Sequence, residues 1–339
     1  MRAAFITRHG PPEALELREA PDLEPGAGEI RIAVRAAGIN FADIMQRMGL
    51  YPTSFKIPYV PGFEAAGVVD RLGAGVENWR EGDRAVALLP CGGYASQVVA
   101  LAARAIAIPN GMCFEEAAAM PVVYVTAYHM MVRQGQLRRG ERIFIHTAAG
   151  GVGMAAIQLA RAIGASIFGT ASPGKHALLR EHGVDHAIDY RTGDWAAEVR
   201  RLTNGEGVDM ILDPLGGSAT KINYSLLAPL GRLIVFGFSR AATGERAGIG
   251  TAIEWLLEMR INPRQLMMDN KTIIGAHIGR MDTPKEAALL LEELAELRKL
   301  YEDGKIRPTI GKMFPLAEAA AAHRYIQRRE NVGKVLLIP

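Results

Sequence analysis

Apolar and polar positions alternate over short stretches in the first third of the chain. Residues 29–36, 65–72 and 84–89 are strand-like in this respect, and Gly and Pro residues separate them. Such a pattern predicts short β-strands joined by turns. We therefore expect residues 1–110 to form a β-rich, partly barrel-like module.

The pattern changes near residue 114, where short apolar strands begin to alternate with helical stretches. This alternation predicts a parallel sheet with helices on both of its faces. We expect strands over 142–146, 166–170, 186–189, 208–212, 233–237 and 271–278. We expect helices over 114–119, 126–133 (after an interruption at Pro121), 154–163, 175–182, 195–203, 225–230 and 253–259.

The C-terminal part returns to a mixed pattern. Residues 283–301 predict a helix because Thr283 can cap it, Glu286 follows three residues later and leucines recur at helical spacing. A helix over 316–327 and a strand over 334–338 are expected next. We expect these last elements to close the first module, which would make that module discontinuous.

Composition narrows the class of protein. A chain of 339 residues suggests two domains, and its 49% hydrophobic and 22% charged residues are ordinary for a globular protein. The net charge of +3 gives no argument for a nucleic-acid partner. The two cysteines, Cys91 and Cys113, exclude a disulfide framework and a four-cysteine zinc site. We expect both to be buried small hydrophobes in a reduced, cytoplasmic setting, with no signal peptide and no membrane span.

A glycine-rich turn carries the first chemical signal. Gly151-Val152-Gly153-Met154-Ala155-Ala156 matches G-x-G-x-x-G/A, follows a predicted strand and opens a predicted helix. Gly151 permits the tight turn, Gly153 lets the backbone approach a pyrophosphate, and Ala156 lets the helix pack on the strand. The free N–H groups at the start of that helix would then face phosphates. A tight turn without a ligand is the alternative.

The end of the second strand suggests which dinucleotide binds. A site for NAD usually has Asp or Glu there to bind the ribose hydroxyls, and the stretch from Phe168 to Lys175 contains neither. Ser172 and Lys175 instead offer a hydroxyl and a positive charge, which suit a 2′-phosphate. This favours NADPH, although Lys175 could also be a solvated lysine at a helix start.

Nothing in the sequence suggests a metal or a hydrolase. The eight histidines show no H-E-x-x-H spacing, and no G-x-S-x-G elbow is present. His146, at a strand end, is interpreted as a structural histidine.

Several motifs occur in a fixed order and together resemble a known family. They read Gly38-Ile39-Asn40-Phe41-Ala42-Asp43, Gly49-Leu50-Tyr51-Pro52, Pro61-Gly62-Phe63-Glu64-Ala65-Ala66-Gly67, Gly82-Asp83-Arg84 and the turn 148–153. The chain thereby resembles the zinc-independent quinone reductases of the medium-chain dehydrogenase/reductase superfamily. Its ending, residues 331–339, resembles the vesicle amine transport protein branch.

The resemblance implies an α/β protein with a GroES-like, β-rich catalytic domain and a Rossmann domain with a doubly wound parallel sheet. The catalytic domain would comprise residues 1–122 and 300–339, and the NADPH-binding domain residues 123–299. In zinc-dependent relatives a cysteine stands where Asn40 stands here, and a histidine where Phe63 stands. The resemblance therefore implies hydride chemistry without a metal.

The resemblance also implies the site residues. Asn40 and Tyr51 would be catalytic, because both could supply hydrogen bonds to the developing oxyanion. The remaining cofactor contacts would fall into groups along the dinucleotide. They are Gly150, Gly151, Val152 and Gly153 at the pyrophosphate; Ser172, Lys175 and Tyr190 around the 2′-phosphate; Gly237, Phe238 and Ser239 at the nicotinamide ribose; His277 and Ile278 at the carboxamide; and Asn40, Tyr51, Thr126 and Asn331 around the nicotinamide. Thr170 would be a further cofactor contact.

We hypothesise that the protein transfers a hydride from NADPH to a quinone or to an α,β-unsaturated carbonyl. Two alternatives stay open: an NADPH-binding regulatory or interaction protein with little turnover, and an enoyl-thioester reductase of a biosynthetic pathway. A homodimer through the apolar strand near 272–276 is expected, since that strand would otherwise be an exposed sheet edge. Residues 51–57 and 240–270 would set the substrate, which the sequence does not identify.

Overall fold

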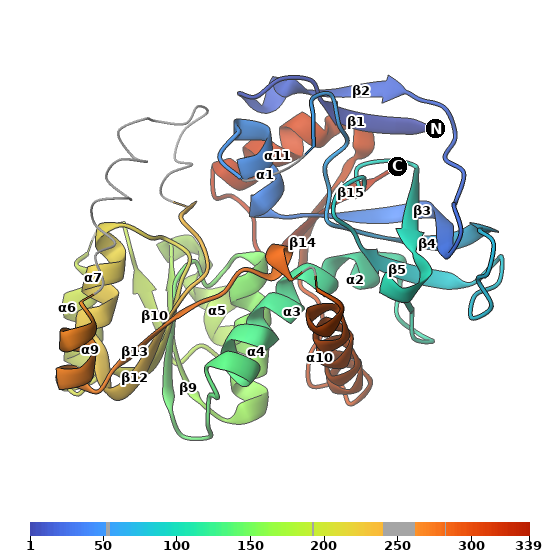
Figure 1. Cartoon of the computed structure of the whole chain (residues 1–339). Coiled ribbons are helices and arrows are strands. Elements are labelled where there is room, and N and C mark those ends of the chain that lie inside the picture. The colour runs from blue at the N-terminus through green and yellow to red at the C-terminus, as the bar shows by residue number, and fades with distance from the viewer. Residues whose placement is uncertain (52–54, 192, 240–261, 282) are drawn as a thin grey trace.

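The computed structural model describes residues 1–51, 55–191, 193–239, 262–281 and 283–339, and the chain forms two lobes that lie side by side (Figure 1). The N-terminal lobe also contains the C-terminus. The second lobe is built from the middle of the chain. No helix in the described ranges is both long and apolar enough to cross a membrane.

The N-terminal lobe is β-rich, as predicted. A hairpin pairs β1 with β2, and a seven-stranded sheet has the order β14-β15-β3-β4-β5-β7, with β6 also paired to β3. The C-terminal strand β15 lies antiparallel to β3, so this lobe is discontinuous in sequence. Its strands are β1 (Arg2–Ile6), β2 (Leu15–Glu19), β3 (Glu29–Ile39), β4 (Glu64–Leu72), β5 (Arg84–Leu88), β6 (Gln97–Leu101), β7 (Ala105–Ala107), β14 (Ile310–Pro315) and β15 (Lys334–Ile338). Its helices are η1 (Pro12–Ala14), α1 (Phe41–Met48), η2 (Ala102–Arg104), α2 (Phe114–Ala119), η7 (Leu316–Glu318) and α11 (Ala319–Gln327).

The second lobe is a Rossmann domain. Its six strands are all parallel in the order β10-β9-β8-β11-β12-β13, so the direction of winding reverses between β8 and β11. Ligands bind beyond the carboxyl ends of strands at such a reversal. The strands are β8 (Arg142–Ile145), β9 (Ser166–Ala171), β10 (His186–Asp189), β11 (Val208–Asp213), β12 (Leu227–Val235) and β13 (Thr272–Gly275). The helices are α3 (Pro121–Tyr128), the π-helix η3 (His129–Gln134), α4 (Gly151–Ile163), η4 (Pro173–Lys175), α5 (His176–Glu181), α6 (Trp195–Leu202), α7 (Ser218–Ser225), α9 (Pro263–Asp269), η6 (Ile278–Arg280) and α10 (Pro284–Glu302).

Two predicted helices were wrong in detail. The first helix, α2, ends at Ala119, so the interruption near Pro121 is confirmed. The next helix, however, starts at Pro121 itself rather than at residue 126, because proline is well tolerated at the first helical position. The helix expected over 225–230 is the start of β12, and α7 comes before it. Leu227 packs into the buried cluster beneath the sheet, and this tertiary contact outweighs local helix preference. The helix expected over 253–259 lies outside the described residues.

The predicted capping of the long C-terminal helix is confirmed. The Thr283 side chain accepts a hydrogen bond from the Glu286 N–H at 3.3 Å, and the Glu286 carboxylate accepts one from the Thr283 N–H at 3.0 Å. These reciprocal bonds satisfy donors that the first turn of α10 would otherwise leave unpaired. The helix then packs against α3 through buried leucines such as Leu297.

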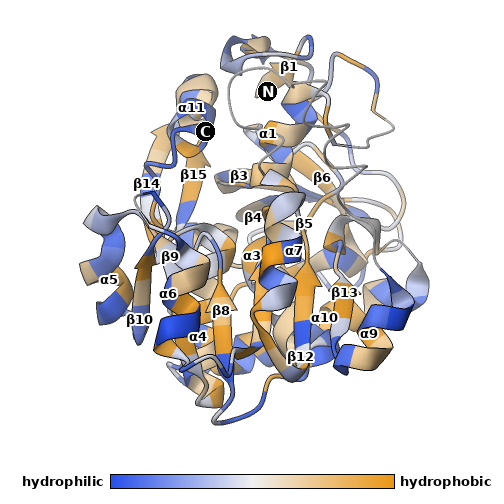
Figure 2. Ribbon diagram, turned by 90° about the vertical axis from the view of Figure 1, so that its left-hand side faces the viewer, coloured by the Kyte–Doolittle hydropathy of each residue, from blue (hydrophilic) through white to orange (hydrophobic). Residues whose placement is uncertain are grey.

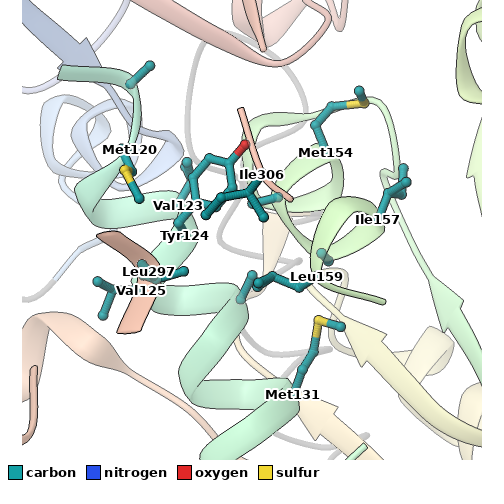
Figure 3. Packing of buried hydrophobic residues seen from close by; sticks show 14 of the residues in the cluster. Met120, Val123, Tyr124, Val125, Met131, Met154, Ile157, Leu159, Leu297 and Ile306 are labelled. Carbon is teal, nitrogen blue, oxygen red and sulfur yellow. The ribbon is translucent and has the colours of Figure 1, made fainter. Parts of the chain in front are cut away.

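One apolar core passes through both lobes. Figure 3 shows Met120, Val123 and Tyr124 facing Met154 and Ile157 of α4, with Leu297 and Ile306 beside them. Residues of β3, β4 and β5 belong to the same cluster. In Figure 2 the Rossmann strands β8 and β12 are mostly orange, whereas surrounding helices such as α5 and α9 carry blue, hydrophilic residues. The relative position of the lobes is therefore set by packing.

A backbone contact joins the lobes next to the glycine-rich turn. The Gly333 N–H donates to the Ala149 carbonyl at 2.8 Å, and Gly333 bridges to Gly150 in parallel orientation. Gly333 has φ of +61°, and a Cβ there would collide with the carbonyl oxygen of Thr309. Only glycine satisfies both conditions.

We predict that Gly333→Ala destabilises the fold by about 2–3 kcal/mol, since left-handed strain and a backbone collision add. Urea unfolding measures the effect. Gly304→Ala is the matched control: its φ is +69° but nothing lies within 4 Å of its Cβ position, so about 1 kcal/mol is expected. Equal losses in the two variants would contradict the role given to the Gly333 contact.

Candidate functional site

The glycine-rich turn presents an uncapped helix start. Helix α4 begins at Gly151, three residues earlier than predicted, and its N-cap, Gly150, provides no side-chain hydrogen bond. The backbone N–H groups of this first turn are therefore suited to an anion. Thr147, just before the turn, has φ of +50°, which is uncommon for a β-branched residue and marks local strain.

Thr170 and Gly153 hold the shape of this turn. The Thr147 N–H donates to the Thr170 hydroxyl at 3.1 Å, and the Ala148 N–H donates to the Thr170 carbonyl at 2.9 Å. A Cβ on Gly153 would collide with the carbonyls of Thr147 and Ala148. The close approach that Gly153 permits is thus between α4 and its own turn.

The residues expected at the 2′-phosphate end are brought together. Lys175 donates to the carbonyl oxygens of Arg329 and Asn331, each at 2.7 Å. Its own N–H donates to the Ser172 carbonyl at 2.9 Å. The Arg329 guanidinium lies 5.5 Å from the centre of the Tyr190 ring. The structure thus places Asn331 against Lys175, between this cluster and the Gly333 contact.

Sequence reasoning missed Arg329. Its only sequence signal is its place beside Arg328 shortly before the C-terminal strand, and folding over more than 130 residues is needed to bring it to Tyr190. Its positive φ of +57° turns the chain so that its carbonyl reaches Lys175.

The electrostatics of this cluster favour an anion. Burial raises the pKa of Tyr190, but hydrogen bonds and charges from Arg329 and Arg191 outweigh it and lower that pKa overall. Burial lowers the pKa of Lys175, and Arg191 lowers it further, against the opposing effect of Tyr190 and Glu330. Excess positive charge on the described residues therefore surrounds the ends of β9 and β10.

Aromatic rings from the two lobes meet near β13, at the edge of the Rossmann sheet opposite to β10. The Tyr51 ring stacks on His277, with 5.4 Å between centroids and 30° between planes, and lies 6.0 Å from Phe63. His277 and Ile278 come shortly after β13, with Ala276 between them and the strand. A Cβ on Gly279 would lie 2.6 Å from the Tyr51 hydroxyl, so this hydroxyl sits close against the chain after β13.

The residues after β12 lie beside this aromatic group. Phe238 and Tyr51 both pack on the apolar face of α1. The Ser239 N–H donates to the Pro214 carbonyl at 2.8 Å, and within the described ranges its buried hydroxyl oxygen has no partner. A Cβ on Gly237 would also press on Pro214. A buried hydroxyl of this kind is suited to a polar ligand group.

The loop after β11 is another part of the site that sequence reasoning missed. The buried Asp213 carboxylate accepts hydrogen bonds from the Leu215 and Gly216 N–H groups and from the Thr220 hydroxyl, at 2.8–3.2 Å. It therefore fixes the loop beyond the reversal point between β8 and β11. The signal was an acid immediately after a predicted apolar strand.

Asn40 is part of a buried charged cluster. Its Nδ2 donates to Glu64 Oε1 at 2.9 Å, and its Oδ1 accepts from the Lys334 Nζ at 2.6 Å. Lys334 Nζ also lies 2.5 Å from Glu64 Oε1, and the other Glu64 oxygen accepts the Val122 N–H at 2.8 Å. Asn40, Glu64 and Lys334 are 7%, 0% and 3% exposed. The Asn40 oxygen is thus occupied, which leaves the second Nδ2 proton as the group available to a ligand.

Thr126, also expected around the nicotinamide, lies on α3 near this cluster. Its hydroxyl donates to the Val122 carbonyl at 2.6 Å, within its own helix.

Asp43 holds Asn40 in place from the other side. Its Oδ2 accepts the Asn40 N–H at 2.7 Å and the Tyr94 hydroxyl at 3.0 Å, and Tyr94 in turn contacts His323 Nε2 at 2.9 Å. Burial raises the pKa of Asp43 to about 7, although the Asn40 N–H, Tyr94 and Lys334 oppose the rise. The start of α1 is therefore anchored through a carboxyl that titrates near neutrality.

The cysteines and His146 have structural surroundings. The expectation that both cysteines are buried was wrong: Cys91 is half-buried and Cys113 is exposed. The Cys113 sulfur accepts the Glu116 N–H at 3.4 Å as the cap of α2. Burial raises the pKa of Cys91 to about 11, which disfavours the thiolate. His146 is buried against Asn223, 2.7 Å away. Within the ranges that the structure describes, no three His, Cys, Asp or Glu side chains form a group suited to a metal ion.

We predict that the Asp43→Asn variant gains stability relative to the unmodified protein as pH rises. The unfolded carboxyl loses its proton near 3.8 and the folded one near 7, so the native Asp43 costs stability as pH rises between these values. The difference in unfolding free energy should shift by roughly 2–3 kcal/mol in favour of the variant between about pH 5 and about pH 8. Urea unfolding of both proteins measures it, and a pH-independent difference would contradict the assignment.

Known families match both lobes. Residues 151–296 match the family described as zinc-binding dehydrogenase, and residues 26–130 match the alcohol dehydrogenase GroES-like domain. The synaptic vesicle membrane protein VAT-1 homolog of Rattus norvegicus is 39% identical, over 100% of this chain and 84% of that protein. A quinone oxidoreductase of Pseudomonas aeruginosa is 35% identical, over 98% of this chain and 97% of its own length.

Solved structures agree with this assignment. The human synaptic vesicle membrane protein VAT-1 homolog-like protein has a TM-score of 0.85 at 34% identity and covers 100% of this chain and 98% of its own. The Escherichia coli quinone oxidoreductase complexed with NADPH has a TM-score of 0.86 at 30% identity and covers 100% of both chains. The chain therefore belongs to the medium-chain dehydrogenase/reductase superfamily, in the branch of the VAT-1 homologues.

Proposed function

We propose that this protein is a zinc-independent reductase that uses NADPH to reduce a quinone or an α,β-unsaturated carbonyl. The observation that carries the proposal is the arrangement along the carboxyl ends of the Rossmann strands. An uncapped helix start lies between a cationic cluster, Lys175 with Arg329, and an aromatic group in which Tyr51 meets His277. A dinucleotide with a phosphate at one end and a flat ring at the other matches this order.

The residues present fit NADPH. The first turn of α4 would hold the pyrophosphate, and Ser172, Lys175, Tyr190 and Arg329 would hold the 2′-phosphate by charge and hydrogen bonding. The buried Ser239 hydroxyl and the backbone after Gly237 would face the nicotinamide ribose. When bound, the reduced nicotinamide supplies the hydride. The complex of the Escherichia coli relative with NADPH supports the assignment.

The chemistry of Asn40 supports a reaction without zinc. In this chain the Asn40 oxygen accepts a hydrogen bond from the Lys334 ammonium at 2.6 Å and is therefore already engaged where a metal ligand would be needed. Phe63 adds an apolar ring where zinc-dependent relatives have a histidine ligand. Negative charge on the acceptor oxygen would then be stabilised by hydrogen bonds, from the Tyr51 hydroxyl and the remaining N–H of Asn40.

The larger organisation is also part of the proposal. We place the catalytic domain at 1–122 and 300–339 and the NADPH-binding domain at 123–299, in a cytoplasmic protein. A homodimer through β13 is supported by the strand order, because β13 is an edge strand of the Rossmann sheet among the described residues. Leu230, Met267 and Met268 beside it are 73%, 67% and 69% exposed. A monomeric mass in light scattering would contradict the dimer.

The test of the proposed function is NADPH oxidation with 9,10-phenanthrenequinone and with a short enone. We expect turnover with at least one acceptor, because hydride transfer needs only a positioned acceptor and hydrogen-bond donors. Absorbance at the NADPH band measures the rate. Tight NADPH binding without turnover would contradict the reductase and favour a regulatory role.

We predict that Lys175→Met and Arg329→Gln each weaken NADPH binding by about tenfold, since each removes one charge near the 2′-phosphate. Binding of NADH should change less than about twofold, because it lacks that phosphate. Fluorescence titration with both cofactors measures the difference. Equal losses for NADH and NADPH would show that the two side chains serve the fold instead.

We predict that Tyr51→Phe lowers turnover more than cofactor affinity. The variant keeps the ring stacked on His277 and removes only the hydroxyl. A loss of about tenfold in kcat is expected if that hydroxyl donates to the reacting oxygen. An unchanged kcat would mean that Tyr51 only lines the site and donates no hydrogen bond to the reacting oxygen.

A further inference from the structure

The orientation of the Asn40 amide is determined by the chemistry of its two neighbours. A lysine ammonium can only donate hydrogen bonds, so the Asn40 atom 2.6 Å from Lys334 Nζ must be the oxygen. A carboxylate can only accept, so the atom 2.9 Å from Glu64 must be the nitrogen. No other assignment of the amide satisfies both contacts.

Lys334 is itself held by the segment that fastens the two lobes. Its backbone N–H donates to the Thr309 carbonyl at 2.8 Å, and the preceding Gly333 donates to Ala149 in the glycine-rich turn. A Cβ on Gly151 would lie 3.8 Å from the Lys334 side chain. The ammonium therefore has a fixed position relative to both Asn40 and the start of α4.

Glu64 balances the charge and cannot move away. It is fully buried, one oxygen accepts from Asn40 and lies beside Lys334, and the other accepts the Val122 N–H at the start of α3. A Cβ on Gly38 would overlap its carboxylate. With Glu64 confined in this way, removing the ammonium would leave the Asn40 oxygen without its donor and the amide held by one side-chain hydrogen bond instead of two.

We propose that Lys334 is a positioning residue that fixes the Asn40 amide with its nitrogen toward Glu64, so that one N–H stays available for a ligand. Its effect on turnover rests on the proposed function; its effect on the amide does not. Lys334 touches neither cofactor nor substrate in this proposal and acts through Asn40.

The first experiment observes the amide without cofactor. In protein labelled with ¹⁵N-asparagine, the Asn40 side-chain resonance is identified by its absence in Asn40→Ala. We expect one of its two protons to lie downfield, because it is hydrogen bonded to a buried carboxylate. In Lys334→Met the resonance should shift and exchange faster with solvent. An unchanged resonance would overturn the proposal whether or not the protein is a reductase.

The second experiment is a double-mutant cycle on kcat. Lys334→Met should lower kcat by about tenfold in the native background and less than about twofold in Asn40→Ala. Equal losses in both backgrounds would show a structural role independent of Asn40 and would overturn the proposal. If the native protein itself reduces neither acceptor, the proposed function fails and the amide experiment alone decides this inference.

Two further variants keep the test decisive. Should Lys334→Met not fold, the double variant Glu64→Gln, Lys334→Met removes both buried charges and is compared with Glu64→Gln alone. We expect the Asn40 resonance to differ between these two variants, and identical resonances would overturn the proposal. Lys312→Met, on the neighbouring strand β14, is the matched control: its ammonium lies over the Phe314 and Tyr325 rings, and we expect the native resonance and native kcat. A changed resonance in this control would overturn the assignment to Lys334.

Discussion

The buried ion pair between Glu64 and Lys334 is the contact on which the rest of this molecule depends. An unpaired charge at either position would be strongly destabilising, so both side chains must be placed together. Doing so brings together β4, the start of α1 at Asn40, the start of α3 at Val122 and the C-terminal strand β15. The Glu64 carboxylate also bonds the Val122 N–H of the second lobe, and the ion pair sets the geometry of Asn40.

The backbone contact at Gly333 extends this constraint to the phosphate-binding turn. Because Gly333 and Lys334 are neighbours, the residue that pairs with Ala149 and the residue that pairs with Glu64 cannot move separately. A few residues earlier in the same segment, the carbonyl oxygens of Arg329 and Asn331 accept hydrogen bonds from Lys175. A short C-terminal segment therefore connects the cationic cluster, the turn and the buried ion pair.

The two ends of the proposed cofactor site use different physical chemistry. At the ends of β9 and β10, burial would raise the pKa of Tyr190, but hydrogen bonds and charges from Arg329 and Arg191 lower it overall. The pKa of Lys175 is lowered mainly by burial, and Arg191 adds to this effect. At the ends of β12 and β13, stacked rings from both lobes and a buried serine hydroxyl provide apolar surface with few polar groups. The carboxyl ends of the strands are therefore cationic at one side of the sheet and aromatic at the other, which suits a ligand that is charged at one end and flat at the other.

Local patterns in the sequence predicted much of the fold and the phosphate turn. Alternation of short strands with helices, the capping pair Thr283 and Glu286, and glycines 151 and 153 depend on neighbouring residues alone. The start of β12 was misread because its leucines are equally suited to a helix until the neighbouring strand β11 is in place. Arg329 was missed because its partners Lys175 and Tyr190 are distant in sequence.

The sequence by itself thus determined the fold class, the family and the position of the dinucleotide turn, since these follow from periodicity and short motifs. Only the tertiary structure decided what Asn40 does with its amide, because Glu64 and Lys334 lie 24 and 294 residues away from it. Hydrogen-bond direction depends on which donors and acceptors surround a group in space, and no local pattern records that. The antiparallel pairing of β15 with β3 brings Lys334 next to Asn40.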